Sequence, residues 1–354
     1  MSSPSTVSPG TLLATGGSGF IGRHLCQALI SRGWKVILLR HRNAIPDALR
    51  GVESVGTLEE IPPDRRIDAV VNLAGARILG PPWTEGRRRL LLESRIGTTN
   101  ALVQWMSRRE QRPEVLVSAS AVGFYGVRGE ERLDESAPPQ PVFQSEICRR
   151  WEDAAQRSMQ YGVRCVLPRF GVVLGTDGGA LPAFLLPARL GLAAVMGSGR
   201  QGFPWIHIDD AVALVLWSLH HDIDGPVNAV APGLVSQRGF QAALCSALRR
   251  PLWLRIPAWT VRVALGEMAQ LLVEGQAQEL AKDKDSDLLI CDTDMLTVRI
   301  WSEEKFGRCH PLLMQLVMDV TYDLWLLCKP DIPWEPDPLR ENPKDRDRLF
   351  AVYE

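Results

Sequence analysis

The sequence predicts an α/β protein of the Rossmann type, with a doubly wound parallel sheet. Three observations lead to this prediction. A short apolar run at residues 11–15 ends in a glycine-rich turn at residues 16–22. Apolar residues then recur at helical spacing over residues 20–30. Beyond them, short apolar runs continue to alternate with helical segments, as they do in parallel sheets.

The later elements follow the same alternation. Short apolar runs predict further strands at residues 34–39, 69–73, 115–117 and 163–167. Beyond residue 175, glycine and proline residues interrupt an apolar segment, which is typical of loops and short helices that cover a substrate cleft.

Composition limits the classes of partner. The 354 residues carry a formal net charge of −1, so we expect no nucleic acid as a bulk partner. Seven scattered cysteines show no CxxC pair and no zinc spacing; we therefore expect no metal site and a reducing compartment.

No apolar run is long and uncharged enough to predict a transmembrane segment. The first ten residues carry no clear targeting signal, which leaves the cytoplasm or the mitochondrial matrix as the expected location.

The glycine-rich turn predicts that the chain binds a nicotinamide dinucleotide. Glycine at the spacing of Gly16, Gly19 and Gly22 lets the backbone approach a pyrophosphate. The helix that begins near Phe20 offers unpaired N–H groups to the same phosphates. We therefore expect cofactor contacts from the residues of this turn: Gly16, Ser18, Gly19, Phe20, Ile21 and Gly22.

The residue type at the end of the second strand selects the cofactor. An acidic residue there would bind the ribose 2′-hydroxyl of NAD, whereas this chain has Arg40, and Arg42 follows closely. Guanidinium groups bind a phosphate dianion through charge-assisted hydrogen bonds. The alternative is that these are ordinary surface residues. We expect NADP(H), bound with the help of Arg40 and Arg42.

Several stretches resemble the extended short-chain dehydrogenases/reductases, and in particular their atypical NAD(P)-binding epimerase family group (family 39U-like). The matching stretches run in the family's order at residues 16–22, 71–75, 118–126, 148–152, 168–175 and 203–210. The resemblance implies a Rossmann core, an NADP(H) site, a small C-terminal lid subdomain and a small-molecule substrate whose identity is unknown. It also implies cofactor contacts at later strand ends, from Leu73, Ala74, Gly75, Ser118 and Arg169. A structural salt bridge is the alternative for Arg169.

The same resemblance divides the chain into four parts. Residues 1–10 are predicted as a flexible N-terminus and residues 11–175 as the NADP-binding core. Residues 176–276 are predicted as a substrate and lid region interleaved with that core. Residues 277–354 form an extension that the family does not match. In it, we expect the apolar helix at Pro311–Leu327 and the proline-rich arm after it to dock onto protein partners.

The resemblance fails at the catalytic dyad. Ordinary extended members use a Ser, a Tyr and, four residues after the Tyr, a Lys. Ser120 falls at the Ser position, but Gln144 and Cys148 fall at the other two, and neither side chain can replace the family's residue. No lysine occurs between Lys35 and Lys282, so the matched fold contains no ammonium group for the nicotinamide ribose.

Other titratable residues have two interpretations each. Tyr125 is either a proton donor that faces the nicotinamide or a packing residue. His207 is interpreted as structural, and Asp209 and Asp210 as caps of a helix at residues 211–219. Glu152 is expected to face solvent.

Three functions result. The first is an NADP(H)-dependent oxidoreductase of unknown substrate, with Ser120 and Tyr125 or an ordered water in the proton path. The second is a catalytically weak NADP-binding protein that acts as a structural or accessory subunit of a larger assembly. The third, a sugar-nucleotide epimerase, is the least favoured because it needs the absent Tyr.

Overall fold

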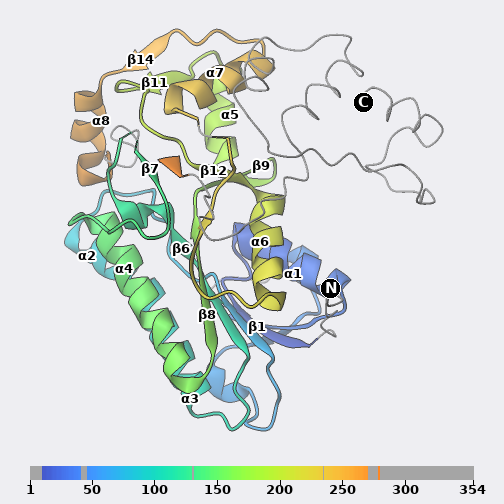
Figure 1. The fold of residues 1–354 in the computed structure, drawn as a ribbon. Coiled ribbons are helices and arrows are strands. Elements are labelled where there is room, and N and C mark those ends of the chain that lie inside the picture. The colour runs from blue at the N-terminus through green and yellow to red at the C-terminus, as the bar shows by residue number, and fades with distance from the viewer. Residues whose placement is uncertain (1–9, 41–45, 130, 234, 270–277, 280–354) are drawn as a thin grey trace, which may run out of the picture. The chain divides into compact units, whose positions relative to one another are not determined.

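The computed structural model describes residues 10–40, 46–129, 131–233, 235–269 and 278–279. All of them belong to one compact unit that comprises residues 1–282 (Figure 1). The predictions for Arg42, for Pro311–Leu327 and for the C-terminal arm lie outside the described residues.

A twisted parallel sheet forms the centre of this unit. Its strands, in spatial order, are β13 (Gly225–Ala229), β8 (Arg164–Phe170), β5 (Val115–Ser118), β4 (Ala69–Asn72), β1 (Thr11–Thr15), β2 (Lys35–Leu39) and β3 (Glu53–Val55). A further short strand, β6 (Ser120–Ala121), pairs with β8. The strand order reverses between β1 and β4, so the fold is doubly wound, as predicted.

The register of the strands aligns their carboxyl ends. Thr15 of β1 lies opposite Leu39 of β2 on one side and Asn72 of β4 on the other. Asn72 in turn lies opposite Ser118 of β5. Since all these pairs are parallel, the loops that follow the strands emerge at one edge of the sheet, where a ligand site forms in such folds.

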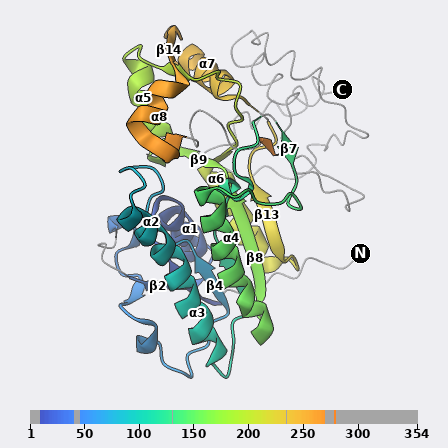
Figure 2. The same ribbon diagram turned by 90° about the vertical axis from the view of Figure 1, so that its left-hand side faces the viewer.

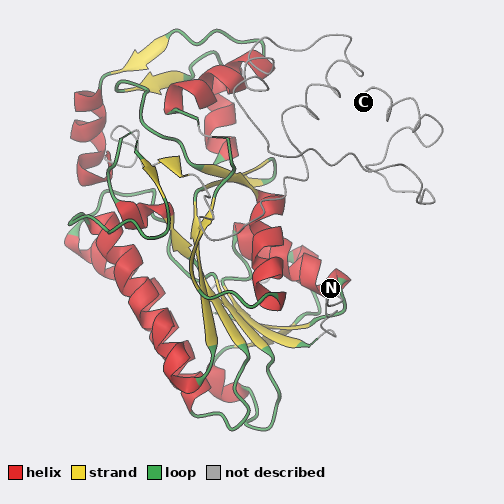
Figure 3. Cartoon of the chain, in the orientation of Figure 1, coloured by secondary structure: helices red, strands yellow, loops and turns green. Residues whose placement is uncertain are grey.

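Helices cover both faces of the sheet (Figures 1 and 3). Helices α1 (Phe20–Ser31) and α6 (Ile208–His220) lie on one face, and α3 (Thr98–Ser107) and α4 (Phe143–Gln156) lie on the other. Because side chains alternate along a strand, β1 contributes to two apolar cores. Leu12 packs in the first core, with residues of α1 and α6, whereas Leu13 packs in the second, with residues of α3.

Most of the remaining strands and helices lie beyond the carboxyl edge of the sheet (Figure 2). A three-stranded sheet contains β10 (Gly178–Gly179), β9 (Val172–Gly175) and β12 (Trp205–His207). Two strand pairs are β11 (Ala194–Met196) with β14 (Leu254–Ile256), and β7 (Arg132–Leu133) with β15 (Gln278–Glu279). The helices are α2 (Glu85–Leu92), α5 (Leu181–Arg189), α7 (Gln237–Ala247) and α8 (Ala258–Leu265), with a π-helical turn at Glu93–Gly97 and 3-10 turns at Asp47–Leu49, Leu58–Glu60, Val122–Tyr125, Arg157–Tyr161 and Gly266–Ala269.

The predicted start and caps of one helix were wrong, and two strands were not predicted. The helix expected at residues 211–219 begins earlier, at Ile208, and its N-cap is His207, whose Nδ1 accepts a hydrogen bond from the Asp209 amide. Asp209 and Asp210 therefore lie in the first turn of the helix and not at its cap. Their negative charges interact favourably with the positive end of the helix dipole there. The short edge strands β3 and β13 were not predicted at all, because neither forms an apolar run.

Candidate functional site

The glycine turn after β1 leaves no room for a side chain at Gly16 or Gly22. Gly16 has a φ of +69°, and its carbonyl accepts a hydrogen bond of 2.9 Å from the Gly19 amide. A Cβ on Gly16 would lie 2.5 Å from the backbone of Leu73, and a Cβ on Gly22 would collide with the Gly16 carbonyl. The turn thus presents bare backbone, as a pyrophosphate site requires.

Helix α1 begins at this turn without a capping side chain. Its N-cap, Gly19, makes no side-chain hydrogen bond, and its first turn contains no acidic residue. The N–H groups at its start and the positive end of its dipole therefore suit an anion. Ser18 and Gly19 are exposed there, whereas Phe20 and Ile21 are partly buried. The Phe20 ring is packed near Gly175, Gly178 and Gly179 of the β9–β10 hairpin.

The loops after β2 and β4 lie on either side of the glycine turn. Arg40 directly follows β2 and is exposed, while its amide donates a 2.8 Å hydrogen bond to the Val55 carbonyl. After β4, the Leu73 amide donates to the Thr15 carbonyl at 3.2 Å. Leu73 and Ala74 are partly buried and Gly75 is exposed. The structure thus brings the predicted cofactor residues of β1, β2 and β4 to one edge of the sheet.

A buried network of polar side chains supports these strand ends. Asn72 lies at its centre: its Oδ1 accepts from the Thr15 hydroxyl at 2.6 Å, and its Nδ2 donates to the Thr99 and Ser118 hydroxyls at 2.8 and 3.1 Å. The indole N–H of Trp151 also donates to Thr99, at 3.0 Å. The Ser118 hydroxyl is therefore engaged inside the protein. Its contact with a cofactor stays a prediction.

The residue expected at the catalytic Ser position makes a short hydrogen bond to a buried carboxylate. Ser120 Oγ donates to Glu152 Oε1 at 2.5 Å. Glu152 is 4% exposed, so its predicted solvent-facing position was wrong. The reason is a tertiary contact, because Arg169 at the end of β8 donates from Nε and Nη2 to the two carboxylate oxygens, each at 2.9 Å.

Arg169 is thereby fixed as part of the protein interior. Its Nη1 also donates to the Tyr125 hydroxyl at 2.7 Å and to the Glu135 carbonyl at 3.0 Å. Burial acts to lower the pKa of Arg169, but the bonds to Glu152 and Tyr125 outweigh it and the pKa is raised. The salt bridge that we considered as an alternative for Arg169 is present, whereas a cofactor contact from Arg169 stays a prediction.

Tyr125 packs inside the protein. Its side chain is fully buried, at 0% exposure, and its hydroxyl donates to Asn228 Oδ1 at 2.7 Å. The backbone N–H of Asn228 donates to Glu135 Oε1 at 2.8 Å. These contacts agree with the interpretation of Tyr125 as a packing residue; its role as a proton donor stays a prediction. Asn228 and Glu135 were missed because they come from short or irregular segments.

The two positions at which the resemblance places the family's Tyr and Lys, Gln144 and Cys148, lie on one face of α4. Gln144 is 3% exposed, and neither its amide nitrogen nor its amide oxygen has a hydrogen-bond partner. Cys148 is also buried, and burial raises the pKa of its thiol to about 12. Both residues lie close to Gly123 in the loop after β6. Neither side chain titrates near neutral pH, so neither can act as the acid or base there.

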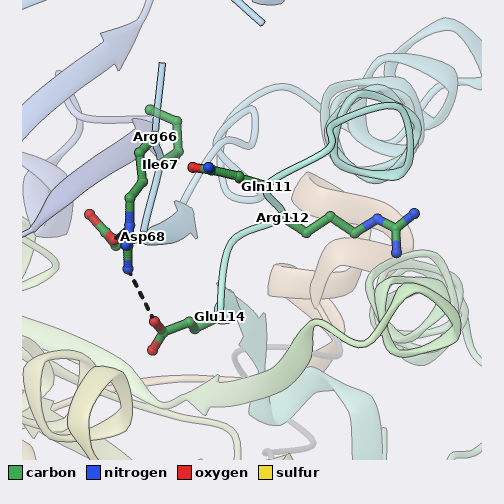
Figure 4. Close-up of a pocket in the computed structure, with 6 residues that line it drawn as sticks. All are labelled: Arg66, Ile67, Asp68, Gln111, Arg112 and Glu114. Carbon is green, nitrogen blue, oxygen red and sulfur yellow. Dashed lines mark hydrogen bonds and ion pairs between the residues drawn. The ribbon is translucent and has the colours of Figure 1, made fainter. Parts of the chain in front are cut away.

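A small hollow at the opposite edge of the sheet is not part of this site (Figure 4). Its volume is about 110 Å³, and its lining includes Asp68 and Glu114, the residues just before β4 and β5. Arg66 pairs with Glu114 across it at 3.6 Å. It therefore lies at the amino ends of these strands, away from the glycine turn.

The described residues contain no group of three or more His, Cys, Asp or Glu side chains that could hold a metal ion. None of the described helices combines the length and apolar character that crossing a bilayer requires.

Known families and sequences match most of the chain. The profile of the NAD dependent epimerase/dehydratase family matches residues 12–230. The chain is 37% identical over 268 residues to "Epimerase family protein YfhF" of Bacillus subtilis, which covers 74% of this chain and 88% of the relative. It is also 37% identical over 270 residues to "Epimerase family protein SDR39U1" of Mus musculus, covering 75% and 90%. A profile of an AAA domain matches residues 256–354, most of which the structure does not describe.

Solved structures also resemble this fold. The human epimerase family protein SDR39U1 (isoform 2), crystallised with NADPH, superposes with a TM-score of 0.67 at 35% identity. The match covers 76% of this chain and 90% of the human one. A nucleoside-diphosphate sugar epimerase from Corynebacterium glutamicum gives a TM-score of 0.56 at 26% identity, covering 85% of this chain and 67% of the other.

Proposed function

Because the chain belongs to the NAD dependent epimerase/dehydratase family, we propose that it binds NADP(H) and acts as an oxidoreductase on a small carbonyl or hydroxyl compound. The observation that carries this proposal is the bare turn at Gly16–Gly22, in which a Cβ on Gly16 or Gly22 would meet backbone. The close packing of the backbone explains why both positions are glycine. The N-terminus of α1 has no capping side chain, so its N–H groups can bind a phosphate. The human relative crystallised with NADPH supports the same cofactor.

Each part of the edge would hold one part of the cofactor. The N–H groups of Ser18, Phe20 and Ile21 would bind the pyrophosphate, and Arg40 would bind the 2′-phosphate of the adenosine half. Residues 73–75 would lie against the cofactor beside the glycine turn, where the strand order reverses. When bound, the nicotinamide supplies or accepts a hydride.

Ser120 and Glu152 would handle the proton. The Ser120 hydroxyl donates to Glu152, so its lone pairs are left to accept a hydrogen bond from a substrate hydroxyl. As that hydroxyl becomes a carbonyl, its proton would pass to Ser120 Oγ while the proton of Ser120 passes to Glu152. In reduction the same transfers run in reverse. Arg169 would hold the carboxylate in place for both directions.

Binding of the two dinucleotides to the full chain tests the cofactor. We expect NADPH to bind at least about ten times more tightly than NADH, which corresponds to about 1.4 kcal/mol. Arg40→Ala should remove most of this preference by weakening NADPH alone. Arg32→Ala is the control, because Arg32 is also exposed but lies at the far end of α1. Equal loss of both dinucleotides in Arg40→Ala would contradict the assignment of the 2′-phosphate site.

Turnover tests the reaction. We expect NADPH oxidation with at least one member of a panel of aldehydes and ketones. Ser120→Ala should lower kcat by about 100-fold or more with an unchanged Kd for NADPH, since proton transfer commonly contributes this much. An unchanged kcat in Ser120→Ala would overturn the proton path.

A second function is favoured by Gln144 and Cys148. These residues stand where the family has its proton-donating Tyr and its Lys, so the chain can be a catalytically weak NADP-binding accessory subunit. Its C-terminal extension would then dock it onto the partner. Tight NADPH binding without turnover of any carbonyl compound, together with a native mass larger than that of the chain's own oligomer, would favour this function over the first.

A further inference from the structure

The nicotinamide half of the cofactor would lie over β4 and β5. The sheet order places β2 on one side of β1 and β4 and β5 on the other. If Arg40 after β2 binds the adenosine half and the glycine turn binds the pyrophosphate, the other half extends over the ends of β4 and β5. The inference below therefore rests on the proposed cofactor site.

Arg95 reaches this half of the edge from the π-helical turn between α2 and α3. Its Nη2 donates to the Ala76 carbonyl at 2.9 Å, and its Nη1 donates to the Leu91 carbonyl at 3.2 Å. Its guanidinium carbon lies 5.1 Å from the centre of the Trp151 ring of α4. A Cβ on Gly75 would lie 3.0 Å from the same carbon. Arg95 thus sits between the loop after β4 and helix α4.

Within the described part of the chain, Arg95 has no carboxylate as a counter-charge. Its hydrogen-bond acceptors are carbonyl groups, and no acidic side chain of the described residues pairs with it. Burial lowers its pKa, because the charge has lost part of its hydration. Arg169 differs sharply, since the carboxylate of Glu152 pairs with its Nε and Nη2. A half-buried cation without a counter-charge is costly unless a ligand completes its contacts.

The position of Arg95 also matches that of the missing lysine. The family's Lys corresponds to Cys148, which lies one helical turn before Trp151 on α4. The guanidinium of Arg95 lies beside the Trp151 ring, so it is next to the turn of α4 that follows Cys148. The chain has no lysine between Lys35 and Lys282. A guanidinium can take the place of the absent ammonium group, and Arg95 is positioned to supply it.

We propose that Arg95 replaces the missing lysine as the cation that binds the nicotinamide mononucleotide half of NADP(H), donating hydrogen bonds to its ribose and phosphate oxygens. Arg95 has five N–H donors, and the Ala76 and Leu91 carbonyls occupy two of them. The Trp151 ring and the two carbonyls hold the guanidinium in place. Such a preorganised cation loses less entropy when it binds than a free surface arginine would.

The test compares two ligands on the full chain. NADPH contains both halves of the cofactor, whereas adenosine 2′,5′-bisphosphate contains only the adenosine half. We expect Arg95→Ala to raise the Kd for NADPH at least about ten-fold, the loss of one charge-assisted interaction, and to change the Kd for the bisphosphate less than about two-fold. Arg95→Lys should recover part of the NADPH affinity. Arg89→Ala, an exposed arginine of the neighbouring α2, is the control that should change neither ligand.

Each outcome is informative. If Arg95→Ala binds both ligands as the unaltered chain does, or loses both equally, the assignment of Arg95 to the nicotinamide half is overturned. If Arg95→Ala does not fold, Arg95→Met keeps the stem over Trp151 without the charge and replaces it in the comparison. If the unaltered chain binds neither ligand, the proposed cofactor site itself fails, which is a different result.

Discussion

Glu152 and Arg169 form a bidentate ion pair inside the protein, with both nitrogen–oxygen distances at 2.9 Å and side chains that are 5% and 3% exposed. The pair joins α4 to the end of β8, and it fixes Ser120 on one side and Tyr125 on the other. One contact therefore positions both residues that the sequence suggested as catalytic.

This pair predicts a large difference between neighbouring acidic residues of α4. Glu152→Gln leaves the buried charge of Arg169 without a counter-charge and should lower the free energy of unfolding by about 3–5 kcal/mol. Asp153→Asn should change it by less than about 0.5 kcal/mol, because Asp153 is exposed and pairs only with Arg149 at the surface. Urea denaturation of both variants measures this. Similar effects of the two substitutions would contradict the buried position of Glu152.

The glycine turn predicts that one methyl group prevents cofactor binding. A Cβ on Gly22 would collide with the Gly16 carbonyl and displace the turn from α1. Gly22→Ala should therefore weaken NADPH binding by about 100-fold or more, while the rest of the sheet still folds. Gly86→Ala is the matched control, since a Cβ there meets no atom within 4 Å. Normal NADPH binding by Gly22→Ala, measured by fluorescence titration, would show that the turn does not hold the cofactor.

The sequence predicted those parts of the site that depend on local chemistry. Gly16, Gly19 and Gly22 could be identified because a glycine turn after an apolar run has few other uses. Glu152 could not, because it lies among charged residues on α4 and only its pairing with Arg169, distant in the chain, makes its burial favourable. Arg95 gave no signal either, since its importance comes from contacts with loops and a helix that only the fold brings together.

The buried thiols predict a loss of stability at alkaline pH. Burial raises the pKa of Cys26, Cys148 and Cys165 to about 12, above the ordinary value near 9 that a thiol has in the unfolded chain. The unfolded chain therefore releases these protons first as the pH rises. The stability that the neutral thiols contribute is fully present below about pH 9 and is lost between about pH 9 and pH 12.

Comparison with Cys148→Ala isolates this contribution from that of other titrating groups. The unaltered chain should lose more free energy of unfolding between pH 8 and pH 10.5 than the variant does, because one buried thiol no longer titrates. Denaturation at the two pH values measures the difference. Identical pH dependence in both proteins would mean that the Cys148 thiol is accessible to water.

The orphaned amide of Gln144 predicts a stabilising substitution. Both polar atoms of this side chain are buried without a partner, and leaving such a group unsatisfied costs about 1–3 kcal/mol. Gln144→Met keeps the shape of the side chain and removes both atoms, so it should raise the free energy of unfolding of the cofactor-free protein by about 1 kcal/mol or more. Gln104→Met, at an exposed position in the middle of α3, should change it by less than about 0.5 kcal/mol. Loss of stability in Gln144→Met alone would show that the amide has a partner in solution and that α4 depends on it.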